Sequence, residues 1–590
     1  MITSQDFDRL IYRKPKTKDK RPQLQNIFGI DSEAYTTGEP FMFCTSESDI
    51  FLPKDIPQVF FEPGSRYHKA NFIIYNIKYD SGALLYHLPK SNLEELRIYG
   101  KTSHNDFRYH YIAHKRLRIE HSNLFVNFWD VSQFYVSTLD RAAQTYLDDR
   151  KTAIRTKRFT PKYVRRYFNH ISRYCIHDAL LTKNLGIYLI NKLKEFGITA
   201  SSLYSCASIS FKYFSDRSRI VTSWRFYNAY PDVLKYACDA YEGGKFEVTQ
   251  RGAFPLAYEY DLTSAYPCEI ANLIDISRAT VRFTSTYEPD ATYGFLRVLI
   301  ENPDGKHLPC GKQLRNLRVY PAGRFYLTIT REEYDYLLLI GIRPTIISAC
   351  WLFTSSTARP YKGIIKHLFD IKSQVKGKDR MLYNVSKIVM NSFYGKCVQC
   401  IPQPDGRIVA GAGWNPVYGA VITANTRIKV TRIQNMLEDD CLAVHTDSVM
   451  TTRPIPEHFI TGEIGEFEYV TEGKGVIVSC GQYQIGDISK FRGFIPRKGE
   501  TWEAVLSRFP HRKKIPYRQL HVESWIEAMA KGHEKNEINV FEPMRKDIDL
   551  NADVKRIWPS RVRGRDLLSR LEKSEPKILL EPLPPKEWGV

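Results

Sequence analysis

Two short apolar segments of this chain each end in an acid at a tight turn, and they constrain the fold more than any other feature. AVHTDSVM (443–450) places Asp447 between two strands joined by a turn. LAYEYDLTSAYP (256–267) delivers Asp261 to the end of another apolar strand. A single acid in a turn is usually only a turn residue. Two carboxylates at one edge of a sheet, however, suit a pair of Mg²⁺ ions, so we predict that Asp261 and Asp447 meet there.

A third segment, KIVMNSFYG (387–395), supports this interpretation. On a helix, Lys387, Asn391 and Tyr394 share one face. A lysine can hold phosphates as a point charge, and an aromatic ring one turn further on can pack against a base or sugar. Gly395 is expected to end the helix or to let a backbone approach closely. An ordinary amphipathic helix is the alternative, but it fits poorly with Lys, Asn and Tyr on one face.

The composition favours a polyanionic partner. The chain carries a formal net charge of +20, with 37 tyrosines and 32 phenylalanines that suit base stacking as well as core packing. Charge alone leaves an anionic membrane surface open as the alternative. No apolar run approaches the ~20 residues of a membrane helix, and the first thirty residues lack a signal-peptide core. We therefore expect no membrane association and a location in the cytoplasm of a host cell.

The cysteines point to a reducing compartment. There are eleven, scattered and odd in number, which favours free intracellular thiols over a disulfide framework. Cys397 and Cys400 form one CxxC pair, but a zinc site needs two more ligands at a suitable spacing, and none stands out.

Strands mixed with long helices indicate an α/β architecture, and 590 residues indicate two to four domains. We read 26–35 and 71–85 as buried strands that meet loops. The stretch 159–197 is largely helical, with Thr160 as its N-cap. The remaining expectations are a mobile basic lead-in at 1–25, helices at 364–397 and 417–440, a buried helix end at 336–342, and basic C-terminal helices followed by a Pro-rich tail.

Acids also mark the N-terminal part of the chain. Asp31 and Glu33 lie on one side of a predicted strand, and Asp80 is predicted to end another strand. Tyr174 and Asp178 share one helical face. Four carboxylates would again suit two metal ions, and a tyrosine could orient an attacking water. Neighbouring polar residues have plainer interpretations, namely packing for His177 and a strand end for Asp130.

In this order, DLTSAYP, KIVMNSFYG and HTDS resemble motifs A, B and C of the family B DNA polymerases, and the N-terminal acids resemble the 3′–5′ proofreading exonuclease of that family. The resemblance implies an α/β multidomain fold, in which an RNase H-like exonuclease domain precedes a right-hand polymerase of palm, fingers and thumb. It implies template-directed DNA synthesis with proofreading by a monomer. The implied cofactors and partners are two Mg²⁺ ions per active site (with Mn²⁺ as a substitute), primer–template DNA and deoxynucleoside triphosphates.

The resemblance also assigns roles to residues of this chain. In the polymerase it implies that Asp261, Asp447 and the Leu262 carbonyl bind metal. Nucleotide binding is implied for Lys387, which contacts the phosphates, for Tyr266, which rejects a 2′-OH, and for Asn391 and Tyr394 beside the nascent base pair. In the exonuclease it implies metal binding by Asp31, Glu33, Asp80 and Asp178, and a water-orienting Tyr174. The implied DNA contacts are Asn76, Tyr241, Gly243, Gly244, Tyr483, Lys490 and Arg492, with Ser132 or Phe134 as further single-strand contacts.

The gap between Asp261 and Lys387 is larger than a bare palm needs, which resembles the protein-primed branch of the family. In that branch an insertion, here placed within 281–360, contacts a terminal protein, and the segment YEGG (241–244) matches a template-binding feature. Its plainer interpretation is a glycine turn. The implied domains are 1–190 exonuclease, 191–280 linker and first part of the palm, 281–360 palm and priming insertion, 361–435 fingers and a short second insertion, 436–500 palm, and 501–590 thumb and tail.

Three departures from the family pattern leave alternatives open. His445 stands where the family has a first acid, and Gly481 stands where it has a lysine that Lys490 or Arg492 could replace. The second insertion, which in the branch encircles DNA, is trimmed to a predicted hairpin. The alternatives are a polymerase that uses an ordinary primer or starts unaided, and a catalytically impaired DNA-binding replication factor.

Overall fold

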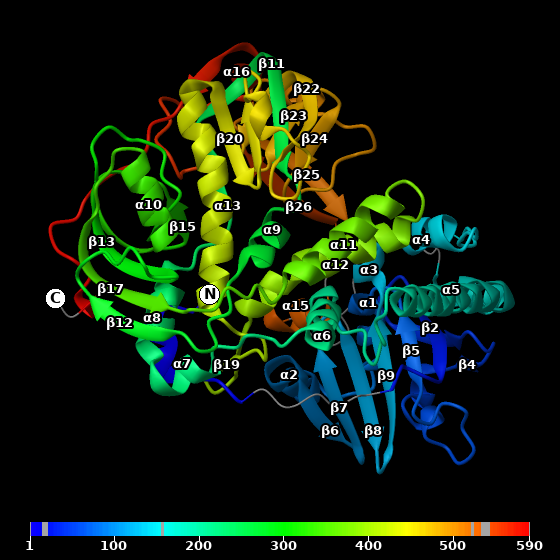
Figure 1. Ribbon diagram of the computed structural model, residues 1–590. Helices are drawn as coiled ribbons and strands as arrows, with labels where there is room; N and C mark the ends of the chain where they lie inside the picture. Colours follow the sequence, from blue (N-terminus) through cyan, green and yellow to red (C-terminus); the bar gives the residue numbers. More distant parts are fainter. Residues whose placement is uncertain (1, 15–21, 155–158, 521–523, 533–542, 589–590) are drawn as a thin grey trace.

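The computed structural model describes the whole chain except residues 1, 15–21, 155–158, 521–523, 533–542 and 589–590. Strands and helices are mixed throughout and form several sheets with helices packed on them, as predicted for an α/β chain (Figure 1). A strand-rich N-terminal lobe, blue to cyan in the figure, lies beside a larger lobe formed by most of the remaining chain. Among the described residues, none of the helices is long and apolar enough to cross a bilayer.

The N-terminal lobe is built on an eight-stranded sheet in the order β4-β3-β2-β5-β9-β8-β7-β6. Its central strands β2, β5 and β9 are parallel, and the outer pairs are antiparallel. The strands are β2 (Ile27–Ala34), β3 (Pro40–Thr45), β4 (Ile50–Phe51), β5 (Asn71–Ile74), β6 (Lys101–His104), β7 (Phe107–Ile112), β8 (Arg116–His121) and β9 (Leu124–Asp130), and the helices on them include α1 (Ile77–Leu84) and α2 (Lys90–Tyr99).

The long helix α5 (Pro161–Glu195) packs directly on β2. It begins at Thr160, whose hydroxyl accepts a hydrogen bond from the Tyr163 amide, as the sequence predicted. A Cβ at Gly29 of β2 would lie 1.8 Å from the carbonyl oxygen of Ala179. The absence of that side chain lets the helix approach the strand closely, which brings the acids of the two elements together.

The second large sheet has the strand order β10-β20-β21-β11-β22-β23-β24, with β27 added beside β11. Helix α13 (Pro416–Leu437) packs against it and is buried along most of its length, and α9 (Ala265–Asn272) packs on α13. The strands are β10 (Lys245–Val248), β11 (Gln250–Leu262), β20 (Cys441–Thr446), β21 (Ser448–Thr451), β22 (Phe467–Ser479), β23 (Gln482–Ile485), β24 (Ile488–Phe491) and β27 (Leu571–Lys573).

A separate sheet has an apolar core of its own, and its strands apart from β28 lie between Asp261 and Asp447 in sequence. The strand order is β12-β17-β13-β16-β28. The helix on it, α10 (Arg331–Leu339), ends as predicted near 339. That end is only partly buried, because Tyr336 and Leu337 are buried whereas Leu339 is 76% exposed. The elements are β12 (Thr280–Thr284), β13 (Tyr293–Asn302), β14 (Lys312–Leu314), β15 (Leu317–Val319), β16 (Ala322–Thr330), β17 (Thr345–Phe353) and, from the C-terminal tail, β28 (Ile578–Leu580).

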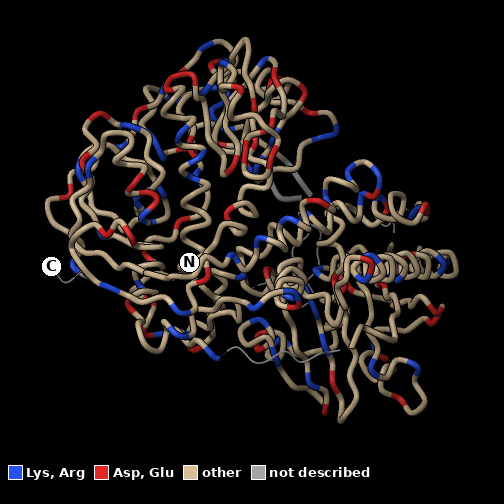
Figure 2. Tube along the Cα trace, in the orientation of Figure 1, with Lys and Arg blue, Asp and Glu red and all other residues tan. Residues whose placement is uncertain are grey.

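Two adjacent helices, α11 (Lys362–Val375) and α12 (Arg380–Cys397), connect the lobes, and lysines and arginines follow both of them (Figure 2). They are preceded in sequence by α6 (Cys206–Arg217), α7 (Trp224–Ala229) and α8 (Pro231–Ala240). The short segment after α12 forms the predicted hairpin, β18 (Cys400–Pro402) and β19 (Ile408–Ala410). The N-terminal strand β1 (Leu10–Ile11) pairs with β19.

Two predictions about the ends of the chain were wrong. The lead-in is packed rather than mobile before residue 15, since Phe7, Leu10 and Tyr12 are buried, and its basic stretch 15–21 lies outside the described residues. The C-terminal part is not a set of basic helices, because it mixes short helices with the two-stranded ribbon β25–β26. Its elements are α14 (Trp502–Arg508), β25 (Lys514–Leu520), α15 (Trp525–Ala530), β26 (Pro543–Asp549) and α16 (Gly564–Ser569).

Candidate active sites

The register of the second sheet brings Asp261 and Asp447 to one edge. Asp261 of β11 pairs with Ser448 of β21, and Asp447 occupies the turn between β20 and β21. The Leu262 amide donates to the carbonyl oxygen of Asp447 over 2.8 Å. Thr446, the residue before the acid, has φ of +62°, a left-handed conformation that is costly for a β-branched residue. The tight turn therefore holds Asp447 beside Asp261, as the sequence predicted.

The electrostatics of this edge favour a cation. Burial and the neighbouring Asp447 raise the pKa of Asp261 to about 7. Burial also raises the pKa of Asp447, while the charge of Lys387 acts in the opposite direction. Two half-buried carboxylates that repel each other are a donor set that a hard divalent ion would stabilise.

The predicted face of α12 points toward these acids. Lys387 is exposed, and its charge acts on both Asp261 and Asp447. The ring of Tyr394 lies 4.5 Å from that of Tyr266, centroid to centroid. Gly395 does not end the helix, which runs to Cys397, and a Cβ on Gly395 would meet nothing within 4 Å. That part of the prediction was wrong.

A second lysine of this site escaped prediction. Lys372 of α11 donates from Nζ to Ser264 Oγ over 3.1 Å, two residues after Leu262. Burial lowers its pKa, and Lys387 lowers it further, so the two ammonium groups lie close enough to interact. The sequence could not single out Lys372 among the lysines of α11, because only its position relative to Ser264 distinguishes it.

The segment 241–244 adjoins the same site. Burial and the nearby rings of Tyr394 and Tyr266 raise the pKa of Tyr241. A Cβ on Gly244 would lie 2.6 Å from the Thr446 side chain, so this glycine permits close approach to the turn that carries Asp447. Gly243 meets nothing within 4 Å, and the structure does not explain why it is glycine.

His445 is a buried neutral acceptor. Its Nε2 accepts from the Gly481 amide over 3.2 Å, and its ring packs between Phe246 and Tyr483. Burial and the positive charges of Lys555 and Arg492 lower its pKa to about 3. Above that pH the position that the family fills with an acid therefore carries no charge.

The neighbouring hairpin holds the remaining predicted DNA contacts. The Tyr483 hydroxyl donates to Glu259 over 2.6 Å, and Tyr483 pairs with Lys490 across β23 and β24. The guanidinium of Arg492 lies 4.4 Å from the ring centre of Phe246. Its stem occupies the space beside Gly481, where a Cβ would lie 2.7 Å from it, so Arg492 takes the volume that a side chain at 481 would need.

The four N-terminal carboxylates converge in the other lobe. Ligand atoms of Asp31, Glu33 and the unpredicted Cys175 lie within 4.8 Å of one another. Asp80 is buried and accepts from Ser32 Oγ over 2.7 Å. Asp178 is buried on α5, and Tyr174 lies one turn before it.

Lys151 is a further member of this site that the sequence did not indicate. Its ammonium forms an ion pair with Asp178 and lies 4.9 Å from the ring centre of Tyr174. His177 bonds to Thr152 over 3.0 Å, so its packing role is to hold the loop that carries Lys151. That loop has no recognisable pattern, and only the fold brings it to the acids.

Repulsion among the acids is strong here as well. Burial and the charge of Asp80 raise the pKa of Asp31, and burial raises the pKa of Asp178 against the effect of Lys151. The pKa of Glu33 rises to about 8 and that of Asp80 to about 7, in both cases mainly through burial. One lysine among four carboxylates leaves an excess of negative charge that fits divalent cations.

Asp80 does not end a strand, contrary to prediction. Strand β5 ends at Ile74, Asn76 takes a left-handed conformation with φ of +75°, and α1 then begins. Asp130 fixes this turn, since its carboxylate accepts from the amides of Asn76 and Ile77 at 3.2 and 3.1 Å. Asp130 itself ends β9, as predicted.

Two smaller predictions have separate outcomes. Asn76 is exposed at the start of α1 and open to a ligand. Phe134 is only 4% exposed and belongs to the core, so it is excluded as a single-strand contact. Cys397 and Cys400 are both free thiols.

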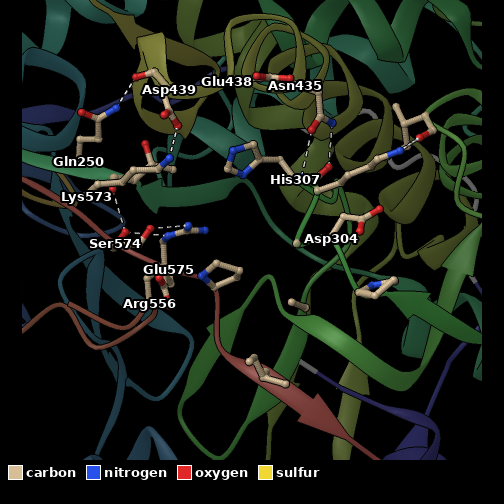
Figure 3. Close-up of a pocket in the computed structure, with 18 residues that line it drawn as sticks. Gln250, Asp304, His307, Asn435, Glu438, Asp439, Arg556, Lys573, Ser574 and Glu575 are labelled. Atoms are coloured by element: carbon tan, nitrogen blue, oxygen red, sulfur yellow. Dashed lines mark hydrogen bonds and ion pairs between the residues drawn. The ribbon is translucent and has the colours of Figure 1, made fainter. Parts of the chain in front are cut away.

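A cavity of about 780 Å³ lies away from both acidic sites (Figure 3). It is lined by the end of α13, the loop 303–307, the turn between β10 and β11, and the tail near Lys573. The acids lie at the opposite end of β20, a strand of six residues and thus ~20 Å long. None of the predicted site residues lines this cavity.

The raised pKa values predict how the metal-free protein responds to pH. The folded state binds protons on Glu33 and Asp80 more tightly than the unfolded chain, so this stabilisation is full below about pH 4 and is lost as pH rises through about 7 to 8. We expect the Tm in EDTA to fall between pH 5 and 8.5, and to fall less for Glu33→Gln/Asp80→Asn. Differential scanning calorimetry measures both; equal slopes for the two proteins would contradict the prediction.

Comparison with known proteins finds similarity to DNA polymerases. Residues 165–403 match the family described as DNA polymerase type B, organellar and viral. The DNA polymerase of Acidianus bottle-shaped virus (isolate Italy/Pozzuoli) is 27% identical over 342 residues, which cover 55% of this chain and 50% of the relative. The chain thus aligns with about half the length of that relative.

Solved structures share the fold. Phi29 DNA polymerase complexed with primer–template DNA and incoming nucleotides superposes with a TM-score of 0.63 at 14% identity, covering 90% of this chain and all of that one. The same polymerase complexed with single-stranded DNA gives 0.57 at 15% identity, covering 78% and 86% of the two chains. The predicted resemblance to the family B DNA polymerases, and the predicted multidomain exonuclease and right-hand polymerase fold, are confirmed.

Proposed function

We propose that this relative of the family B DNA polymerases is a template-directed DNA polymerase with a 3′–5′ proofreading exonuclease. The observation that carries the proposal is the meeting of Asp261 and Asp447 at one sheet edge, beside Lys387 and a cluster of tyrosines. Phosphoryl transfer needs little covalent help from a protein, and positioning with electrostatic stabilisation supplies most of the rate. This edge offers both.

The donor set fits two divalent cations, with Mg²⁺ the natural choice for carboxylates. Asp261, Asp447 and the Leu262 carbonyl would hold them, and the chemistry they supply is stabilisation of the attacking and leaving oxygens. Lys387 and Lys372 place two ammonium groups where triphosphate oxygens need positive charge. Because His445 is neutral, this edge carries one negative charge fewer than it would with an acid at position 445.

The remaining residues are assigned by their neighbours. Tyr266 and Tyr394, in ring contact, form a wall for the sugar and base of the incoming nucleotide, with Asn391 one turn before Tyr394 on the same helix. Tyr483, Lys490 and Arg492 lie on the hairpin beside Glu259, where they support the primer strand. Tyr241 and the two glycines that follow support the template beside the tyrosine cluster.

The exonuclease assignment is supported by the other acidic site. Asp31, Glu33, Asp80 and Asp178 supply carboxylates for two cations, and Asn76 lies exposed at the start of α1 for the primer end. Tyr174, beside the ammonium of Lys151, is placed to orient an attacking water. Separate sites for synthesis and removal of nucleotides are the arrangement that proofreading requires.

We further propose priming by a terminal protein. Strands β12 to β17 form a unit inserted between Asp261 and Lys387. One face of its sheet has an apolar core of its own, while Phe295 and Leu352 on the other face pack into the large core of the chain, and such a unit offers a docking surface without disturbing the site. The proposal extends to replication of a linear viral or plasmid genome. Labelling of a terminal-protein hydroxyl with a radioactive deoxynucleotide would distinguish it from use of an ordinary nucleic-acid primer.

Extension of an end-labelled primer on a template, with Mg²⁺ and with or without deoxynucleotides, tests the function. The chain should lengthen the primer when all four nucleotides are present and shorten it when they are absent. Binding of the primer–template without either reaction, in Mg²⁺ and in Mn²⁺, would instead favour an impaired replication factor.

Tyr266 should determine sugar selection. Replacing it with Val removes the ring that contacts Tyr394 and leaves room for a 2′-OH. We expect incorporation of ribonucleotides relative to deoxynucleotides to rise by about 10- to 200-fold, the range that small steric differences in a pocket produce. Single-nucleotide kcat/KM values measure the ratio, and an unchanged ratio would remove Tyr266 from this role. Tyr258→Val, a stacked tyrosine earlier on β11, is the matched control.

A further inference from the structure

Helix α1 has two sides with different contacts. One side carries Asp80, buried among the acids of the N-terminal lobe and bonded to Ser32. The other side carries Lys78 and Ser81, three residues apart, and both contact α15 from the C-terminal part of the chain. Figure 1 shows α15, in orange, among the blue and cyan elements of this lobe.

The contact is specific and buried. Trp525 is 1% exposed, and its Nε1 donates to Ser81 Oγ over 3.1 Å. Its ring centre lies 5.2 Å from that of Tyr111, and Tyr111 also shares a hydrogen bond with Ser81. Lys78 and Glu527 form an ion pair of 2.9 Å.

Helix α15 depends on this contact for its structure. It has six residues, fewer than an isolated helix needs in water, although Ser524 and Glu527 form a capping box at its start. Trp525, Ala528 and Met529 belong to the apolar core of the N-terminal lobe rather than to that of the C-terminal elements. The ribbon β25–β26 thus reaches from one lobe and is anchored in the other.

Asp80 needs such an anchor. Its carboxylate repels that of Asp31, and the eight-residue α1 is shorter than an isolated helix needs to be stable in water, so its place depends on packing. Asp130 fixes the first turn of α1 through two amides. Ile77, Ala83 and Leu84 of α1 are buried in the core of the N-terminal lobe, and Trp525 packs in the same core and bonds to Ser81, the residue that follows Asp80 in sequence.

We infer that Trp525 is a positioning residue for the exonuclease site, because it holds α1 and thereby fixes Asp80 among the other acids. The inference rests on the proposed exonuclease function. The ribbon β25–β26, with α15, is then a structural part of the proofreading site. The N-terminal lobe alone would lack a complete site. Loss of Trp525 should impair nucleotide removal and metal binding there without affecting synthesis.

The test compares Trp525→Ala and Trp525→Phe with the unmodified full chain. Outer partners of metal ligands typically contribute 10- to 100-fold, so Trp525→Ala should slow single-turnover shortening of labelled single-stranded DNA by at least about tenfold and raise the Mg²⁺ concentration for half-maximal rate severalfold. Trp525→Phe keeps a ring but lacks the N–H donor, and should fall between the two. Single-nucleotide incorporation on a primer–template should stay within about twofold of the unmodified chain.

Metal binding provides a second measurement, which does not depend on catalytic activity. In an Asp261→Ala/Asp447→Ala background, which lacks the polymerase acids, Mn²⁺ binding followed by electron paramagnetic resonance reports on the remaining site. Trp525→Ala should weaken that binding by about tenfold. Trp558→Phe is the matched control, since that indole also donates, over 3.0 Å to the Asp553 carbonyl, but lies outside the core that holds α1.

The outcomes distinguish failure of the role inferred for Trp525 from failure of the exonuclease assignment. Unchanged shortening rate and Mn²⁺ affinity in Trp525→Ala would overturn the inference while leaving the exonuclease intact. If the unmodified chain fails to shorten single-stranded DNA, the exonuclease assignment is wrong and the inference fails with it. A loss of shortening together with an equal loss of incorporation would indicate general unfolding and would also overturn it.

Discussion

Replacing Asp447 with Ala is expected to abolish nucleotide incorporation while nucleotide removal continues. The acid lies in a strained turn, where it and Asp261 form the edge that would hold the cations. Loss of one preorganised electrostatic group in phosphoryl transfer costs about 10³-fold or more, so primer extension should fall at least that far. Single-turnover incorporation on an end-labelled primer–template is the measurement.

The design includes a matched control and a clear contrary result. Asp439→Ala removes an acid from the segment that leads into the same strand β20, but at the end of that strand far from the site, and should incorporate normally. In the presence of deoxynucleotides, Asp447→Ala should only shorten the primer. Incorporation within tenfold of the unmodified chain would show that the reaction does not use this carboxylate, and the polymerase assignment of this edge would be wrong.

The positions of Asp261 and Asp447 could be predicted because the structure around each acid is local. Asp447 sits in a turn between two strands contiguous in sequence, and Asp261 ends one long strand, so the apolar pattern around each acid already defines its place. The helix face of Lys387 and Tyr394 is likewise set by spacing alone. What no spacing could supply was Lys372, whose proximity to Ser264 depends on how α11 packs.

Three of the errors involve distant partners. The apolar run before Asp80 predicts a strand that ends at this acid. In the structure helix α1 begins before this acid instead, because Asn76 is left-handed and the carboxylate of Asp130, 54 residues further along the chain, accepts from its amide. Lys151 reaches the acids from a loop without a pattern. The C-terminal part was read as helical from its basic residues, whereas pairing of β25 with β26 and docking of α15 in the other lobe decide its structure.

Replacing the acids proposed for the exonuclease should impair nucleotide removal and leave nucleotide incorporation intact. Replacing Asp31 and Glu33 together with Ala removes two of the three groups whose ligand atoms lie within 4.8 Å of one another. We expect shortening of single-stranded DNA to fall by at least about 10³-fold, since both positions of an in-line displacement lose their electrostatic support. Incorporation should be unaffected, because Asp261 and Asp447 belong to a different sheet.

A pair with the same spacing provides the control. Glu47 and Asp49 are also two residues apart and lie on the same sheet's edge, between β3 and β4, but outside the acidic site. Their double Ala variant should retain shortening within about twofold, because both side chains are half-exposed and their partners, Lys183 and Tyr67, are not among the acids of the site. Because the Asp31/Glu33 variant also loses buried repulsion, its metal-free form should be more stable at pH 8 than the unmodified chain. A variant that is both more stable and inactive in nucleotide removal would show that these acids are retained for the reaction at a cost to the fold, whereas a less stable one would mean that they support the structure of the lobe.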